Sequence, residues 1–269
     1  MFLELGPHDG LAYHYQAPSR KDAPTLVCFN PLTGDRGMWE TGVGPALIAH
    51  GCGLLTWNLR GQTGSPFTPS AIHQDNIVSD CGQLLRHVKP RQPLFVGLSV
   101  GGLYAAQVHL GQQGYPCHGL VLINTLREMG PRLAWVNQAL VRLAETGGLE
   151  LLRDIYSPLL LGEDWLARNR GDFLKTGGYQ PLPRSEGAWQ LLKAGENTLW
   201  NVHWSNLDVP VLNITGLQDH VFRDDQVIAR LLPQFKDVKA IEYADAGHMI
   251  PAEAPERLAR DILNFISSR

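Results

Sequence analysis

A serine with a glycine two positions before it and another two positions after it is the most reactive feature of the sequence. Ser99 lies between Gly97 and Gly101, after an apolar run and before a segment rich in small residues. Glycines at this spacing let a strand turn sharply into a helix and project the hydroxyl above the sheet edge in a strained backbone conformation. The free N–H groups at the helix N-terminus favour negative charge there. The pattern predicts a nucleophile; the plainer alternative is that Ser99 only caps the helix.

A serine hydroxyl needs a base, and the base needs an orienting carboxylate. His248 follows the last apolar run of the chain, and Asp219 follows the run before it. Ligands of parallel sheets bind beyond the carboxyl ends of the strands, so both side chains are expected at the edge that carries Ser99. We therefore predict Asp219 as the acid and His248 as the base. Other candidates are interpreted differently. Asp208 precedes its strand, and Asp224 and Asp225 look like the first residues of a helix. Asp245 is interpreted as a polar loop residue and His220 as a surface or pocket-rim residue.

Acyl transfer also needs two N–H donors aimed at the developing oxyanion. The amide of Val100, directly after Ser99, is predicted as the first donor. The second is expected from the loop that follows residues 25–29, which reads Asn30-Pro31-Leu32. Proline has no N–H, so the amide of Leu32 is the predicted second donor.

Short apolar runs alternate with helical patterns along most of the chain. Nearly all-apolar strands, as expected when a sheet is covered on both faces, are predicted at 25–29, 54–57, 94–98, 120–123, 209–214 and 238–243. Helices are predicted at 74–88, 99–113, 224–232 and 254–266. This alternation favours an α/β fold with a mostly parallel central sheet and helices on both faces. Residues 2–5 and 11–17 are expected to add an antiparallel edge.

The alternation fails between about residues 127 and 203, where amphipathic runs replace strands. Leu133, Val136, Leu140 and Leu143 share one helical face, and Gly147-Gly148 interrupts the pattern. We predict a helical cap at 127–205, inserted between the core segments 1–126 and 206–269. Five of the seven tryptophans lie in or near it. We expect most of them to pack, and some to line a ligand cavity.

Composition excludes several classes of protein. With 23 basic and 26 acidic residues among 269, the chain lacks the charge of a nucleic-acid binder. The stretch between Arg91 and Arg127 has no charged residue, but polar residues and glycines break it well short of a membrane span. Four widely spaced cysteines predict free thiols and a cytoplasmic protein, although the spacing leaves one disulfide open. No metal or organic cofactor and no signal peptide are expected.

These motifs resemble those of α/β-hydrolase-fold serine hydrolases, and the likeness covers nearly the whole chain. The elbow around Ser99, then Asp219 and His248, follow the family's order of nucleophile, acid and base. Residues 58–65 are similar to its D-x-R-G-x-G-x-S loop, with Asn58 in place of Asp. Asn30-Pro31-Leu32 stands where many members have His-Gly-x and is similar to the Asn-Ser-Leu of enol-lactonases. A second acid position used by some members is Asn124 here, which favours Asp219.

The resemblance implies hydrolysis of a small, largely apolar carboxylic ester through an acyl-enzyme. Lactone or carbon–carbon bond hydrolysis with the same triad is the first alternative. A receptor-like member with only slow hydrolysis is the second. Relatives that act as dehalogenases or epoxide hydrolases use Asp at the elbow, so Ser99 argues against both. The sequence leaves the oligomeric state open.

Overall fold

The computed structural model describes residues 1–111 and 114–269 and contains one eight-stranded sheet. The strands are β1 (Phe2–Gly6), β2 (Asp9–Gln16), β3 (Thr25–Phe29), β4 (Gly53–Trp57), β5 (Pro93–Leu98), β6 (Gly119–Ile123), β7 (Val211–Gly216) and β8 (Val238–Tyr243). Their order across the sheet is β1-β2-β4-β3-β5-β6-β7-β8. From β4 to β8 the pairs are parallel, whereas β1–β2 and β2–β4 are antiparallel. The predicted fold class and antiparallel edge are thereby confirmed.

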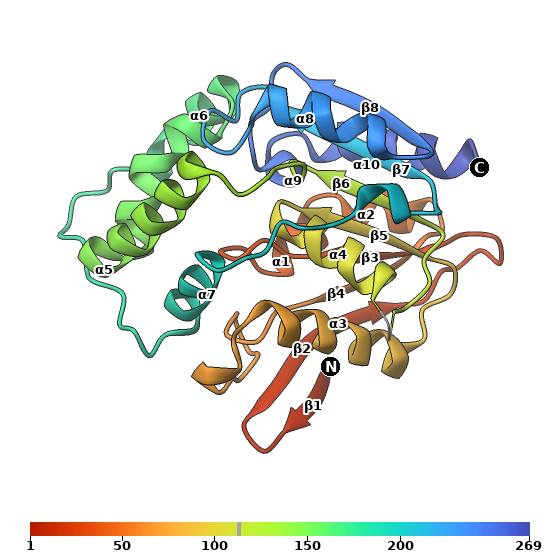
Figure 1. Cartoon of the computed structure of the whole chain (residues 1–269), viewed down its shortest axis with the longest axis horizontal. Helices are drawn as coiled ribbons and strands as arrows, with labels where there is room; N and C mark the ends of the chain where they lie inside the picture. The colour runs from red at the N-terminus through yellow and green to blue at the C-terminus, as the bar shows by residue number, and fades with distance from the viewer. Residues whose placement is uncertain (112–113) are drawn as a thin grey trace.

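The helices outside the long β6–β7 connection cover both faces of the sheet (Figure 1). They are α1 (Gly37–Thr41), α2 (Gly44–Ala49), α3 (Gln74–Val88), α4 (Val100–Leu110), α8 (Asp225–Leu231), α9 (Ile250–Glu253) and α10 (Pro255–Ser267). Because successive strand residues face opposite sides, Val27 and Phe29 join the apolar core under α3 and α4. Leu26 and Cys28 join a second core under α1, α2 and α10. The strands from β4 across to β7 are thus buried on both faces, as their largely apolar sequences require, whereas the edge strands β1, β2 and β8 are partly exposed.

Predicted and observed boundaries differ at two informative places. β7 begins at Val211 rather than Val209, because Pro210 has no N–H to donate to the strand ladder. The helix predicted from residue 99 begins at Val100, and Ser99 stands before it with a positive φ of 58°. The helix ends at Leu110, and residues 112 and 113 of the predicted 99–113 span lie outside the described residues. No helix in the described ranges is long and apolar enough to cross a bilayer.

Three helices fill the connection between β6 and β7 and stand together beside the sheet, at the left of Figure 1. They are α5 (Pro131–Leu160), α6 (Glu163–Arg168) and α7 (Gly187–Gly195). α5 is broken where predicted, since Gly147 and Gly148 depart from helical geometry. α5 packs on α7 through Val141, Ala144 and Trp189. The predicted apolar face is partly wrong: Leu133 and Leu140 line a cavity together with Ser99, whereas Val136 and Leu143 line a separate outer groove. The 3.6-residue period predicts which residues of α5 share a face of the helix. How α5 packs on α7 then decides which of them point into the cavity.

Candidate active site

The chain turns sharply at Ser99, between β5 and α4. Ser99 has φ 58° and ψ −125°, a strained conformation for a residue with a side chain. A Cβ at Gly101 would overlap the Phe29 carbonyl oxygen, and one at Gly102 would overlap the Thr125 hydroxyl. Only glycine permits this close approach of helix to sheet. The Ser99 hydroxyl makes no capping bond to the helix, so the capping alternative fails.

Asp219 and His248 come together at the same edge of the sheet, in the loops that follow β7 and β8. Asp219 Oδ2 lies 2.6 Å from His248 Nδ1, and both side chains are buried. Asp219 Oδ1 accepts hydrogen bonds from the amides of Val221 (3.1 Å) and Phe222 (2.9 Å). Burial alone raises the pKa of the Asp219 carboxyl. The His248 charge and hydrogen bond, the Phe222 amide and the Arg127 charge outweigh burial and lower that pKa below its ordinary value.

Ser99 and His248 line one cavity of about 120 Å³, together with Leu32 and Val100. Across the described part of the chain, no hydrogen bond joins the Ser99 hydroxyl to His248. Ser99 Oγ instead accepts a hydrogen bond from Arg127 Nη2 at 3.2 Å. The structure therefore pairs Asp219 with His248 directly and brings Ser99 to the same cavity without a direct bond.

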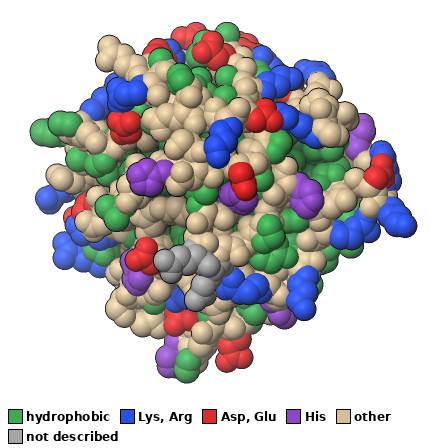
Figure 2. Space-filling view, turned by 45° about the vertical axis from the view of Figure 1, so that its right-hand side comes forward, with side chains coloured by type: hydrophobic (Ala, Val, Ile, Leu, Met, Phe, Trp, Pro, Cys, Tyr) green, Lys and Arg blue, Asp and Glu red, His purple; other side chains and the backbone are tan. Residues whose placement is uncertain are grey.

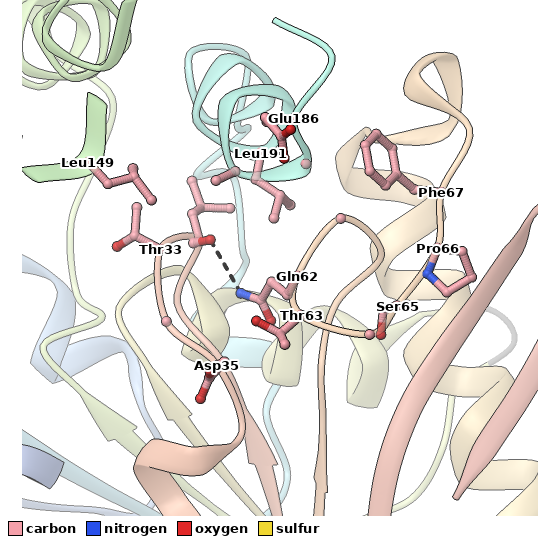
Figure 3. Close-up of a pocket in the computed structure, with 16 residues that line it drawn as sticks. Thr33, Asp35, Gln62, Thr63, Ser65, Pro66, Phe67, Leu149, Glu186 and Leu191 are labelled. Atoms are coloured by element: carbon pink, nitrogen blue, oxygen red, sulfur yellow. Dashed lines mark hydrogen bonds between the residues drawn. The ribbon is translucent and has the colours of Figure 1, made fainter. Parts of the chain in front are cut away.

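Buried amide side chains shape the loop that carries Leu32. Asn30 Nδ2 donates to Gln62 Oε1 (2.9 Å) and Asn58 Oδ1 (3.3 Å). Gln62 Nε2 donates to the carbonyls of Pro31 (2.8 Å) and Leu32 (3.3 Å), the second of which is the dashed bond in Figure 3. In a trans peptide, N–H points opposite to the preceding C=O. The amide of Leu32 therefore points away from Gln62.

The Leu32 amide donates no hydrogen bond among the backbone and side-chain bonds of residues 1–111 and 114–269. The N–H of Val100, in the first turn of α4, has no partner within its helix. Both predicted oxyanion donors are thus unoccupied and border the cavity of Ser99. A larger cavity of about 620 Å³ lies on the other side of this loop, between Gln62, Phe67 and the start of α7 (Figure 3). Ser99 and His248 do not line it.

The competing acidic residues have other tasks. Asp208 pairs with His109, and Asp245 pairs with Arg257 on the surface. Asp224 caps α8 by accepting from two backbone amides, and Asp225, the first residue of that helix, pairs with Arg223. His220 is exposed. The interpretation of these residues from sequence holds in each case.

The sequence analysis missed three residues that hold the site together. Asn124 accepts from the Gly216 amide (2.8 Å) and donates to the carbonyls of Gly247 (3.0 Å) and His248 (2.9 Å). It thereby joins the end of β6 to the segments that follow β7 and β8 and carry Asp219 and His248. Its place at the carboxyl end of β6, beside the predicted site edge, is the sequence signal that points to this role.

Glu253 is the second missed residue. Its carboxylate accepts from the amides of Gly162 (2.7 Å), Gly247 (2.8 Å) and Met249 (2.8 Å). It links the segment after α5 to both sides of His248. The third is Arg127, which follows β6 by four residues and ends the charge-free stretch noted in the sequence.

The described residues hold no cluster of His, Cys, Asp and Glu that is suited to a metal ion. All four cysteines are free and buried, as predicted. Lys and Arg side chains are interspersed with Asp and Glu on the face shown in Figure 2.

Comparisons with known proteins agree with this architecture. A family model described as alpha/beta hydrolase fold matches residues 24–255. Over 250 residues the chain is 22% identical to 3-oxoadipate enol-lactonase 2 of Acinetobacter baylyi, covering 91% of this chain and 90% of that protein.

Solved structures show the same fold. An esterase from Exiguobacterium antarcticum superposes with a TM-score of 0.81 at 13% identity, covering 99% of this chain and 98% of that one. The enol-lactonase from Burkholderia xenovorans LB400 superposes with a TM-score of 0.76 at 22% identity, covering 96% and 97%. At such identities the superpositions establish the fold alone.

Proposed function

The chain belongs to the α/β-hydrolase fold family, as its motifs predicted, and from this we propose that it is a serine hydrolase of small carboxylic esters. The observation that carries the proposal is the buried Asp219–His248 pair, 2.6 Å apart, beside a strained Ser99 that lines the same cavity. A serine hydroxyl is activated by a neighbouring imidazole that a carboxylate holds in place, and Ser99, His248 and Asp219 match these three parts.

The mechanism proceeds through an acyl-enzyme. Ser99 Oγ attacks the ester carbonyl carbon while His248 takes the hydroxyl proton, and the amides of Leu32 and Val100 stabilise the oxyanion. The bond to the alcohol oxygen then breaks, and His248 returns the proton to the departing alcohol. A water molecule then gives a proton to His248 and attacks the acyl carbon; the bond to Ser99 Oγ breaks, His248 returns the proton to Oγ, and the acid is released. Asp219 keeps the imidazole oriented and stabilises its charged form.

For this sequence of steps, the Ser99 hydroxyl must exchange its Arg127 contact for one with His248. We propose that rotation about the Ser99 Cα–Cβ bond turns the hydroxyl toward His248, since both residues border one cavity. Catalytic hydrogen bonds of this kind often form only when substrate is bound.

The cavity favours a small acyl group. Its volume is about 120 Å³, and a protein cavity of about 150 Å³ accommodates benzene. The apolar side chains that line it include Leu133, Leu140, Leu152, Leu160, Leu192 and Trp200. Most come from the segment 127–205, which we propose as the cap that selects the substrate. The free buried thiols fit the cytoplasmic location that the sequence favours.

Replacing the nucleophile tests the proposal. With 4-nitrophenyl butyrate, we expect Ser99→Ala to lower kcat by about 10⁴-fold or more. Ser205→Ala, at an exposed serine outside the cavity, is the matched control and should keep the parental rate. Parental hydrolysis by Ser99→Ala would show the assignment to be wrong.

Multiple-turnover kinetics separate the alternatives. An ester hydrolase turns over repeatedly across a panel of short- and long-chain esters, whereas a receptor-like member stops after one product per chain. Preferred turnover of lactones in the same panel would point to a lactonase with the same triad.

A further inference from the structure

Arg127 is a buried cation that the proposed hydrolytic steps do not use. Its side chain follows β6 and is only 6% exposed. The guanidinium Nη2 donates to the Asn124 carbonyl (2.6 Å) and to Ser99 Oγ (3.2 Å). Its Nε is buried and has no hydrogen-bond partner. A buried donor without a partner is unfavourable in the free protein and needs an explanation.

The charge of Arg127 also lacks a counter-ion. In residues 1–111 and 114–269, no carboxylate lies within ion-pair distance of it; the acidic group that acts on it is Asp219, which is bound to His248. The guanidinium lies over the rings of Trp200 (4.9 Å) and Phe222 (4.7 Å). Burial lowers the pKa of Arg127 to about 10, so the side chain stays charged at neutral pH.

The free donor and the uncompensated charge border the cavity of the nucleophile. Apart from His248, Arg127 is the one ionisable residue among the described residues that line it. A carbonyl carbon under attack stands about 3–3.5 Å from the serine oxygen, so it lies at most about 7 Å from Arg127 Nη2. A group that binds the guanidinium therefore belongs to the same small substrate as the ester.

Arg127 also lines a second cavity, of about 270 Å³. Arg132, Arg223 and Arg230 line it, against Glu128 and Asp224. Arg223 is paired with Asp225 and Arg230 with Glu128, so Arg127 and Arg132 are the cations of this described lining that have no ion-pair partner, and their charge favours the approach of anions.

We propose that Arg127 binds a carboxylate on the acyl part of the substrate, which makes the substrates half-esters of short dicarboxylic acids. The inference rests on the proposed function of Ser99. It restricts the substrates to esters whose acyl part is a short apolar chain that ends in a carboxylate. A carboxylate suits the planar guanidinium, because two parallel N–H···O bonds engage Nε and one terminal nitrogen together. Binding there satisfies the free Nε and releases Ser99 Oγ toward His248.

The test compares ethyl hydrogen succinate with ethyl succinamate, which replaces the carboxylate by an uncharged amide of the same shape. Ethanol release is followed by proton NMR. We expect the wild type to prefer the acid by about 10-fold to 100-fold in kcat/KM, the range for hydrogen bonds to a charged group. Equal kcat/KM values for the two esters would overturn the inference while leaving the proposed hydrolase intact. If neither ester nor any aryl ester is turned over, the proposed function itself fails.

Substitution assigns the preference to the side chain. Arg127→Met should reduce the acid-to-amide ratio to about 1, and Arg127→Lys, which keeps the charge without the planar fork, should retain part of it. Arg168→Met, at an exposed arginine of α6 that lines neither of these two cavities, is the control and should keep the ratio within about 2-fold.

A purely structural role for Arg127 predicts that both esters lose rate equally, so that the ratio survives in Arg127→Met; that result refutes the inference. Should Arg127→Met fail to fold, the wild-type ratio and its decrease in Arg127→Lys decide the question. An unchanged ratio in the lysine variant, or a wild-type ratio of 1, then counts against it.

Discussion

Glu253 provides a sharp test of how the segment around His248 is held in place. Its two carboxylate oxygens accept three backbone N–H groups, at 2.7–2.8 Å, from Gly162, Gly247 and Met249. Burial raises the pKa of this carboxyl, so the charged form is desolvated and depends on these donors. Glu253→Ala leaves all three amides without their acceptor.

The expected destabilisation follows from these bonds. Glu253 is half-buried, so water can replace part of each bond, and we take the lower value of about 1 kcal/mol for each N–H. The sum is about 3 kcal/mol, or a decrease in Tm of about 6–12 °C for a chain of this size. Because two of the donors flank His248, kcat/KM should fall as well, by about 10²-fold for a displacement of about 1 Å.

The assay is thermal and urea unfolding at pH 8, with ester hydrolysis measured on the same samples. Glu256→Ala removes an exposed carboxylate from the first turn of α10 and serves as the control, with an expected loss below about 1 kcal/mol. If Glu253→Ala melts within about 2 °C of the wild type and keeps its kcat/KM, the three hydrogen bonds do not position the base and the reasoning is refuted.

Two further predictions concern buried charges. The folded-state pKa of Asp219 is below its ordinary value, so its contribution to stability is complete above the unfolded pKa and is lost as the pH falls through the folded one. The unfolding free energy of Asp219→Asn should therefore fall less steeply than that of the wild type as the pH drops below about 4, as followed by urea unfolding; parallel curves would contradict this. Arg60 binds Asp80 through two hydrogen bonds of 2.6–2.7 Å, and Arg60→Met should cost about 3–5 kcal/mol because it strands a buried carboxylate. Since burial already raises the pKa of Asp80, that loss should shrink as the pH is lowered and Asp80 takes up a proton. Arg20→Met, which breaks an exposed pair with Asp22, should leave the unfolding free energy close to that of the wild type at either pH, and an equal loss in both variants would count against the argument.

The 58–65 loop departs from the family motif at Asn58, and side-chain hydrogen bonds hold it nevertheless. Asn58 replaces the expected Asp, yet its amide still holds the loop, since Nδ2 donates to the Thr63 carbonyl (2.6 Å) and Oδ1 accepts from the Arg36 amide (2.7 Å). Gln62 supplies the contact to the Leu32 loop. The sequence shows the substitution, but only the contacts reveal that amide side chains hold this loop.

The sequence by itself determined the features that depend on local chemistry. Strand runs buried on both faces must be apolar, an elbow needs glycines beside Ser99, and the carboxyl ends of parallel strands share one edge. These rules predicted the sheet and the approach of Asp219 to His248.

Tertiary structure alone decided the remaining features, because they arise between segments that are distant along the chain. The pairing of Arg127 with Ser99 joins two different strand–loop junctions, and the bond from Glu253 to Gly162 spans 91 positions. Neither has a spacing rule, since long-range contacts depend on how helices and loops pack rather than on any repeating period. The same holds for the inward edge of α5, which its contact with α7 selects.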